Sequence, residues 1–175
     1  MRRWRKQMAY MIEELVEAYS ERLLRYATSI LYHHQDAEDV VQEVFVAAYQ
    51  NLSTFDGRHL SAWLYKITYH KSITKLRKRK VLPFGELPVN TVVTPQSTAL
   101  SDETMQALGR LKPQERALLY GRIIEGYSYE ELAEQMSTSP ATLRKRYERA
   151  KKKLAHILSN EHQNFNTKQE GVVYD

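Results

Sequence analysis

Apolar residues recur every three or four positions along most of the chain, which is the spacing of amphipathic helices. This spacing predicts one or two helices over residues 8–32 and a third helix over residues 62–80. The clearest apolar stripe covers residues 37–52, and Asp36 directly before it is expected to be the N-cap of that helix. Further helices are expected over 102–158, with no strand anywhere, so the sequence predicts an all-α protein.

The segment 81–101 interrupts the helical pattern. It holds three of the five prolines (Pro83, Pro88 and Pro95) and is expected to be a flexible linker. The chain is therefore predicted to form two small helical domains, residues 8–80 and 102–158. The polar residues 159–175 are expected to be a disordered tail.

Residues 128–153 have the pattern of a helix-turn-helix. Ser128 is expected to cap a short helix ending at Met136, and a three-residue turn then leads to Pro140, a suitable first residue for the next helix. That second helix presents a basic face that could enter the major groove of DNA. The alternative is an ordinary helical hairpin with a solvated basic face. The residues expected to face DNA are Thr142, Arg144, Lys145, Arg146, Glu148 and Arg149.

Charge is divided into blocks along the chain, although the net charge is only +5. Residues 26–57 contain no Lys or Arg, and residues 57–85 contain no Asp or Glu. Such separation indicates two different partners, one of them a polyanion. Within the acidic block, Asp39, Gln42 and Glu43 share one helix face, which suits a basic protein partner. From charge alone, a solvated helix with an acidic N-terminus is the more common reading.

Several strings resemble bacterial RNA polymerase sigma factors. Asp36-Ala37-Glu38-Asp39 with Gln42-Glu43 and Phe45 resembles the core-polymerase-binding helix, and Trp63-Leu64-Tyr65-Lys66-Ile67 resembles the promoter-melting segment. Leu108 to Ala150 is similar to the family's C-terminal DNA-binding domain. With two domains and a short linker, the chain resembles the extracytoplasmic-function (ECF) group over about residues 10–80 and 102–158.

The resemblance implies roles for particular residues. The acidic helix would dock on the clamp helices of the largest polymerase subunit, through Asp36, Glu38, Asp39, Gln42, Glu43 and Phe45. The loop 53–60 would receive a base flipped from the proximal promoter element. Melted DNA would lie against Phe55, Trp63, Tyr65, Lys66, Tyr69, His70, Lys71 and Arg77. Trp63 could instead be a core residue, and Tyr65 and Tyr69 could be amphipathic cover.

The same resemblance implies that the helix-turn-helix reads the distal promoter element as a duplex, and that an anti-sigma factor, often at the membrane, holds the protein inactive. The sequence departs from the family at His70, where relatives often have Asn, and at Thr74, where they often have Asp. In the recognition helix, Ala141-Thr142-Leu143 replaces the common Gly-Thr-Val. These departures affect which promoter sequence is recognised.

Two other classes of function were weighed. A helix-turn-helix regulator with an N-terminal sensor domain explains the second half of the chain, but it leaves the acidic and basic helices of the first half unexplained. An enzyme is not expected. The chain has no Cys, no HExxH string and no Gly-rich phosphate loop, and the adjacent His33 and His34 would point about 100° apart on a helix. We therefore expect no metal, cofactor or small-molecule substrate, and, without a signal peptide or membrane span, a cytoplasmic location.

Overall fold

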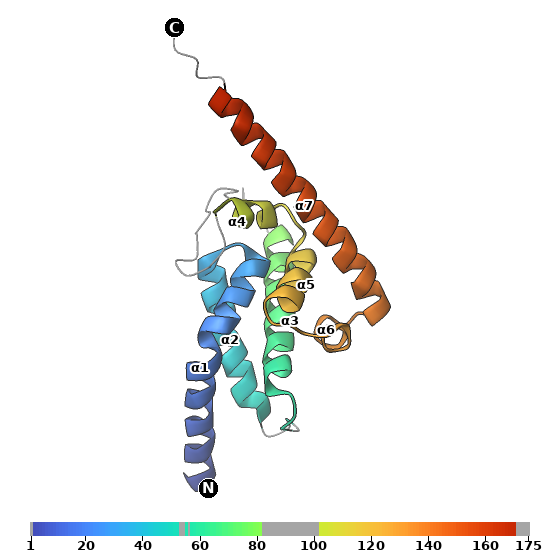
Figure 1. Cartoon of the computed structure of the whole chain (residues 1–175). Coiled ribbons are helices and arrows are strands. Elements are labelled where there is room, and N and C mark those ends of the chain that lie inside the picture. The colour runs from blue at the N-terminus through green and yellow to red at the C-terminus, as the bar shows by residue number, and fades with distance from the viewer. Residues whose placement is uncertain (1, 53–54, 56, 82–101, 171–175) are drawn as a thin grey trace.

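The computed structural model describes residues 2–52, 55, 57–81 and 102–170, with side chains for residues 11–79 and 106–160 of these ranges. The described residues form seven helices and no strand, which confirms the predicted all-α fold. Figure 1 shows α1, α2 and α3 packed side by side and α7 running past the other helices as the longest helix of the second half. Helix α6 packs against α3, and α5 packs against α1. The helices are α1 (Arg2–Leu31), α2 (His34–Asn51), α3 (Leu60–Val81), α4 (Asp102–Gly109), α5 (Pro113–Ile123), α6 (Tyr129–Met136) and α7 (Pro140–Glu170).

The first three helices form the first domain around an apolar core. Each contributes residues from one face, because side chains three or four positions apart meet on the same side of a helix. Tyr26 and Ile30 of α1, Val40 and Val44 of α2 and Leu64 of α3 are almost completely buried. The faces of α2 and α3 that point away from this core are polar.

The helix-turn-helix forms as predicted in the second domain. Ser128 caps α6: its Oγ accepts a hydrogen bond from the Glu131 amide at 3.1 Å, while the Glu131 carboxylate accepts one from the Ser128 amide at 2.8 Å. The Glu131 carboxylate accepts hydrogen bonds from both the amide and the hydroxyl of Ser128, and these lower the pKa of Glu131. The close contact between α5 and α6 depends on Gly121, where an added Cβ would lie 2.7 Å from Leu132 Cδ2. Sequence analysis did not identify this contact.

The two domains pack against each other and share a continuous apolar core. Arg116 of α5 reaches into the first domain and donates hydrogen bonds to the carbonyl oxygens of Ser29 at 2.6 Å and Ile30 at 2.5 Å. It also donates to the Leu111 carbonyl at 2.6 Å, within its own domain. Burial lowers the pKa of Arg116 to about 10. One buried cation therefore satisfies carbonyl groups at the end of α1 and in the turn before α5.

Helix boundaries differ from expectation at the start of α1, which begins at Arg2 instead of residue 8, at the cap of α2 and at the end of α7. The N-cap of α2 is His33, whose Nδ1 accepts a hydrogen bond from the Asp36 amide at 3.3 Å, so the prediction that Asp36 caps this helix is wrong. The Asp36 carboxylate instead pairs with α3. Helix α7 continues to Glu170, although disorder was expected from residue 159, because no Gly or Pro interrupts residues 141–170. The predicted linker, apart from residue 81 at the end of α3, lies outside the described residues.

Candidate nucleic-acid interface and acidic groove

A shallow groove crosses the outer face of α2 beside α3. It has a volume of about 380 Å³ and contains the three polar residues that the sequence placed on one helix face. Val46, 57% exposed, adds an apolar surface at the same place. We name this surface the acidic groove, lined by Asp39, Gln42, Glu43, Val46, Ala47, Gln50 and Lys71.

The acids of α2 form ion pairs with the basic residues of α3. Lys75 Nζ lies 2.7 Å from Asp39 Oδ2, and Lys71 Nζ lies 3.0 Å from Glu43 Oε2. Asp36 is nearly buried and pairs with Lys75 at 3.5 Å and with Arg79. These contacts, the α2–α3 ion pairs, partly neutralise both the acidic groove and the basic helix expected to approach DNA.

Two other residues expected at the protein interface lie differently. Phe45 is 9% exposed and packs in the core, so it supports the acidic groove from beneath instead of lining it. Glu38 lies at the surface, with its carboxylate 3.3 Å from the His34 ring nitrogen. Of the six residues, Asp39, Gln42 and Glu43 are thus the ones gathered at the groove.

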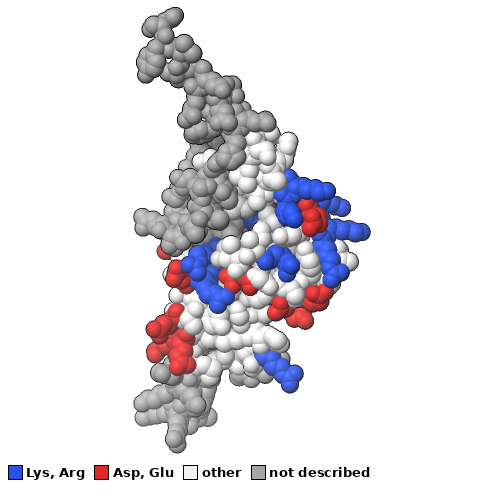
Figure 2. Space-filling model, viewed as in Figure 1, with Lys and Arg blue, Asp and Glu red and all other residues white. Residues whose placement is uncertain are grey.

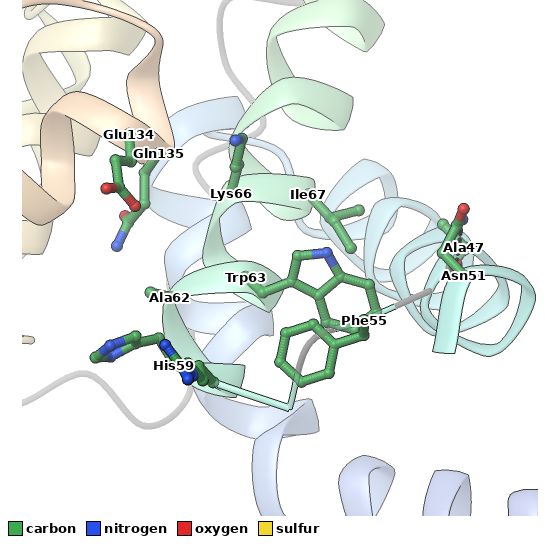
Figure 3. Close-up of a pocket in the computed structure, with 11 residues that line it drawn as sticks. Ala47, Asn51, Phe55, His59, Ala62, Trp63, Lys66, Ile67, Glu134 and Gln135 are labelled. Carbon is green, nitrogen blue, oxygen red and sulfur yellow. Dashed lines mark hydrogen bonds between the residues drawn. The ribbon is translucent and has the colours of Figure 1, made fainter. Parts of the chain in front are cut away.

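A second cavity, of about 560 Å³, lies at the start of α3 (Figure 3). Phe55 and Trp63 stack at its edge, with ring centroids 4.5 Å apart and planes 20° from parallel. Trp63 is half-buried, so its ring is a wall of the cavity as well as a packing residue. We name this cavity the aromatic pocket, lined by Ala47, Asn51, Phe55, Arg58, His59, Ala62, Trp63, Lys66, Ile67, Glu134 and Gln135.

The loop before α3 needs unusual backbone angles to form this pocket. Gly57 and His59 have φ values of +78° and +51°, in the left-handed region, where Gly is the residue with least strain. The turn places His59 and Arg58 at the rim, beside Trp63. Both residues belong to the loop 53–60 that was expected to receive a flipped base, although neither was predicted individually; the Gly57-Arg58-His59 string after Phe55 was the available signal. It could not have found Glu134 and Gln135, which come from α6.

The tyrosines of α3 lie beneath the second domain. Tyr65 is fully buried and Tyr69 is 7% exposed. The Tyr65 ring packs against Tyr26 at 4.9 Å and edge-on against Tyr127 of the second domain at 5.4 Å. Burial raises the pKa of Tyr65 and of Tyr69. In this arrangement neither ring is accessible to a nucleic acid.

The other α3 residues expected to meet melted DNA, apart from Trp63, lie at or near the surface. Lys66, His70 and Arg77 are exposed, and Lys71 is half-buried at the acidic groove. His70 Nε2 lies 3.4 Å from Ser137 Oγ, just after α6. Burial and the nearby Lys66 lower the pKa of His70 below its ordinary value. The residues expected to meet melted DNA are therefore split between an exposed set and a covered pair.

The first turns of α7 carry the basic face predicted for DNA binding. Figure 2 shows Lys and Arg gathered at the right of the molecule, over this part of α7. Arg144 pairs with Glu130 at 3.1 Å and lies 5.4 Å from the Tyr129 ring centroid. Thr142 is half-buried and shares a hydrogen bond of 2.8 Å with Ser139, at the turn before α7. Lys145, Arg146, Glu148 and Arg149 are exposed.

Two further classes of site were sought in the described ranges. Among those residues, no three His, Cys, Asp or Glu side chains are grouped closely enough to hold a metal ion. Likewise, none of the helices, over the residues described, combines the length and apolar character needed to cross a membrane.

Comparison with known proteins gives two family matches, in chain order. Sigma-70 region 2 matches residues 15–81, and Sigma-70, region 4 matches residues 101–154. The RNA polymerase sigma factor YlaC of Bacillus subtilis (strain 168) is 30% identical over 154 residues, covering 82% of this chain and 89% of that protein. The ECF RNA polymerase sigma factor SigW of the same organism is 26% identical over 166 residues, covering 83% and 87%.

The chain spans 61% of the length of a longer relative, the ECF RNA polymerase sigma factor SigE of Mycolicibacterium smegmatis, with 27% identity over 157 residues. The similar solved structures include two complexes of other proteins. CnrH in complex with the cytosolic domain of CnrY has a TM-score of 0.61 and 26% identity, covering 85% of this chain and 88% of that one. The sigma factor RpoE in complex with the anti-sigma factor NepR, from Bartonella quintana, has a TM-score of 0.72 and 24% identity, covering 84% and 96%.

Proposed function

The chain belongs to the extracytoplasmic-function subfamily of RNA polymerase sigma factors, and we propose that it divides promoter recognition among the three surfaces described above. As a sigma factor it is a transcription initiation factor that directs core RNA polymerase to specific promoters. Phosphodiester bond formation belongs to the polymerase, and this chain supplies binding and positioning.

The acidic groove is the surface that we assign to core polymerase. Asp39 and Glu43 provide negative charge, and Val46 beside them provides an apolar contact. Such a surface suits a partner helix with basic side chains around an apolar strip. The clamp helices of the largest polymerase subunit are the partner that the family resemblance implies.

The aromatic pocket is the surface that we assign to a flipped base of the proximal promoter element. Its volume of about 560 Å³ accommodates a nucleobase, and the stacked Phe55 and Trp63 rings offer a flat platform. Lys66 at its edge can hold a phosphate of the same strand. Stacking on aromatic side chains stabilises a bound base by about 1–3 kcal/mol. This offsets much of the few kcal/mol needed to unstack that base from the duplex.

The first turns of α7 are the surface that we assign to the distal element. Arg149 and Arg146 are exposed there, and an Arg side chain can bind guanine through two hydrogen bonds. Ser128 and Pro140 fix the two helices of the motif so that these side chains project together. Lys145 is suited to a phosphate contact, which positions the protein without reading sequence.

We also propose a protein inhibitor as a partner. Both similar solved structures contain a second chain, and in the structure from Bartonella quintana that chain is an anti-sigma factor. An inhibitor of that kind, in some cases held at the membrane, would keep this protein from polymerase until a stress or envelope signal arrives. We place the protein in the cytoplasm, since core polymerase and the promoters are there.

The order of the two sigma regions along one chain, 15–81 and then 101–154, is the observation that carries the proposal. It is tested by in-vitro transcription with purified core polymerase and fragmented DNA from the source genome, with and without the protein. New transcription starts that share two short upstream blocks are expected. The proposal is wrong if no start depends on the protein and the protein alone shifts a specific duplex, which is the behaviour of a helix-turn-helix regulator.

A further inference from the structure

Arg144, in the first turns of α7, differs from the other arginines of that basic face because side chains of α6 hold it. Its Nη2 donates a hydrogen bond to Glu130 Oε1 at 3.1 Å, and its Cζ lies 5.4 Å from the centroid of the Tyr129 ring. Arg146 and Arg149 are exposed and, in the described part of the chain, have no carboxylate within ion-pair distance. The first turn of α6 therefore restrains one guanidinium of the face and leaves the other two free to move.

The Tyr129 ring that supports Arg144 is itself fixed by side chains of α5 and α7. Arg122 Cζ lies 4.5 Å from the Tyr129 ring centroid, and the Tyr147 ring meets the Tyr129 ring edge-on at 6.1 Å. Arg122 is held in turn by the hydrogen bond that its Nη1 donates to the Tyr127 carbonyl. Because the half-buried ring is packed from two other helices, it offers the Arg144 guanidinium a firm surface for a cation–π contact.

These contacts contribute little to folding. The side chains of Arg144 and Glu130 are 59% and 65% exposed, and ion pairs at such exposed positions stabilise a fold only weakly. Their value lies in orientation, because a flexible Arg side chain loses conformational entropy when it binds, and one that is already oriented loses less. An Arg side chain also has more N–H donors than the bond to Glu130 uses, so donors remain for DNA.

We propose that Glu130 and Tyr129 are positioning residues for Arg144, and that Arg144 reads one guanine of the distal promoter element. The carboxylate holds one Nη atom while the ring supports the guanidinium, so the remaining donors are presented together to O6 and N7 of the base. Glu130 and Tyr129 act through Arg144 and need no contact with DNA. The inference rests on the proposed function of α7 as the reader of duplex DNA.

The test is a double-mutant cycle with the holoenzyme. Binding is measured to a promoter found by transcription mapping and to duplexes in which each base pair of the distal element is replaced in turn. The base pair read by Arg144 is the one at which Arg144→Ala no longer discriminates. Glu130→Gln, which keeps the size of the side chain and removes its charge, is then measured alone and together with Arg144→Ala. Glu21→Gln is the control, because Glu21 is an exposed acid that pairs with Arg25 at 2.7 Å within α1.

Glu130→Gln is expected to reduce discrimination at that one base pair about two- to fivefold, the range that an exposed ion pair can supply. Discrimination at the other base pairs should not change, whereas simple removal of a negative charge near DNA would raise the affinity for every duplex alike. Tyr129→Leu should also reduce discrimination, and Tyr129→Phe, which keeps the ring, should not. In the Arg144→Ala background Glu130→Gln should have no effect on discrimination, because the group that it positions is absent.

The positioning role is refuted if Glu130→Gln discriminates like the control, or if its effect persists in the Arg144→Ala background. Base reading by Arg144 is refuted if Arg144→Ala discriminates at every base pair as the unchanged protein does. In that case, weaker promoter binding by Arg149→Ala would still support the proposed function of α7. Holoenzyme binding that does not depend on the distal element at all would overturn that function as well.

Discussion

Helices α3 and α7 both carry runs of Lys and Arg, but their surroundings differ. Lys71, Lys75 and Arg79 of α3 pair with acids of α2, and Tyr65 and Tyr69 on the same helix are covered by the second domain. The first turns of α7 instead face solvent. In the described part of the chain, Arg144 is paired with Glu130, while Arg146 and Arg149 have no carboxylate within ion-pair distance.

The difference matches the form of DNA that each helix is proposed to bind. A duplex is present before initiation, so a reader of duplex can be ready in advance. A single strand appears only as the promoter opens, and an exposed basic and aromatic surface would bind unrelated single-stranded nucleic acid in the meantime. Pairing and burial of the α3 side chains would limit that unwanted binding.

Replacing the pocket's aromatic wall should have the largest effect. Trp63→Ala removes the ring that stacks on Phe55 and should reduce promoter opening about 100-fold, since stacking contributes up to about 3 kcal/mol per base. Trp63→Phe keeps a flat ring and should retain much of the activity. Permanganate reactivity of unpaired thymines measures the opening. Equal loss of distal-element binding by the same variant would count against separate roles for α3 and α7.

Removing one recognition side chain from α7 should have the next largest effect. Arg149→Ala is expected to weaken binding to promoter DNA by the holoenzyme about tenfold, within the range of about 1–3 kcal/mol for an Arg–base contact. Binding to core polymerase should be unchanged, because Arg149 is not among the residues that line the acidic groove. Loss of polymerase binding in this variant would contradict the division between the surfaces.

Neutralising the acids of the groove should move two affinities in opposite directions. Asp39→Asn with Glu43→Gln should weaken binding to core polymerase several-fold by removing charge that attracts a basic partner. The same change frees Lys71 and leaves Lys75 with Asp36 as its one remaining carboxylate partner among the described residues, so it should strengthen single-strand binding by the free protein a few-fold.

Glu38→Gln is the matched control for the single-strand affinity, because Glu38 is an acid of the same helix that pairs with His34 instead of with a residue of α3. Fluorescence anisotropy with labelled DNA and with labelled polymerase measures both affinities. If single-strand affinity is unchanged, the α2–α3 ion pairs do not restrain α3.

A modest pH effect should come from His70, which touches the turn after α6. While the two domains are packed together, its pKa lies below the ordinary value of 6.5 because of burial and Lys66. The packed arrangement therefore has its full stability above pH 6.5 and loses some as the pH falls below that value. With dyes attached at Glu17→Cys on α1 and Ala155→Cys on α7, both exposed positions in a chain without Cys, energy transfer should decline slightly on acidification, and His70→Gln should remove that part of the decline. A decline of equal size in the variant would assign it to other groups, such as His33.

Local patterns in the sequence predicted the helices and the helix-turn-helix, because apolar spacing, Ser128 and Pro140 act over a few residues. They also grouped Asp39, Gln42 and Glu43 on the face where the acidic groove lies. What could not be predicted depends on residues distant in the chain. The Arg22–Glu125 pair spans 103 positions, and the Arg116 bonds to α1 span 86 and 87.

The same limitation explains the misplaced α2 cap. Asp is a residue type preferred at N-caps, but the Asp36 carboxylate pairs with Lys75 and Arg79. His33 is the N-cap of α2 instead. Likewise, the helical spacing of Tyr65 and Tyr69 predicts that they share one helix face, but it does not predict which part of the protein covers that face. The aromatic pocket could be anticipated from Phe55 and Trp63, but its α6 side could not.

The decisive measurement of the proposed sigma-factor role is DNA binding with and without core polymerase, using one promoter found by transcription mapping. A forked DNA carrying the distal element as duplex and the proximal element as single strand is titrated with the free protein and with the holoenzyme. We predict weak, sequence-independent binding by the free protein and tight, sequence-specific binding by the holoenzyme, which Trp63→Ala and Arg149→Ala each reduce. Equally tight and specific binding by the free protein would contradict the proposed role as a sigma factor, because core polymerase would then not be needed.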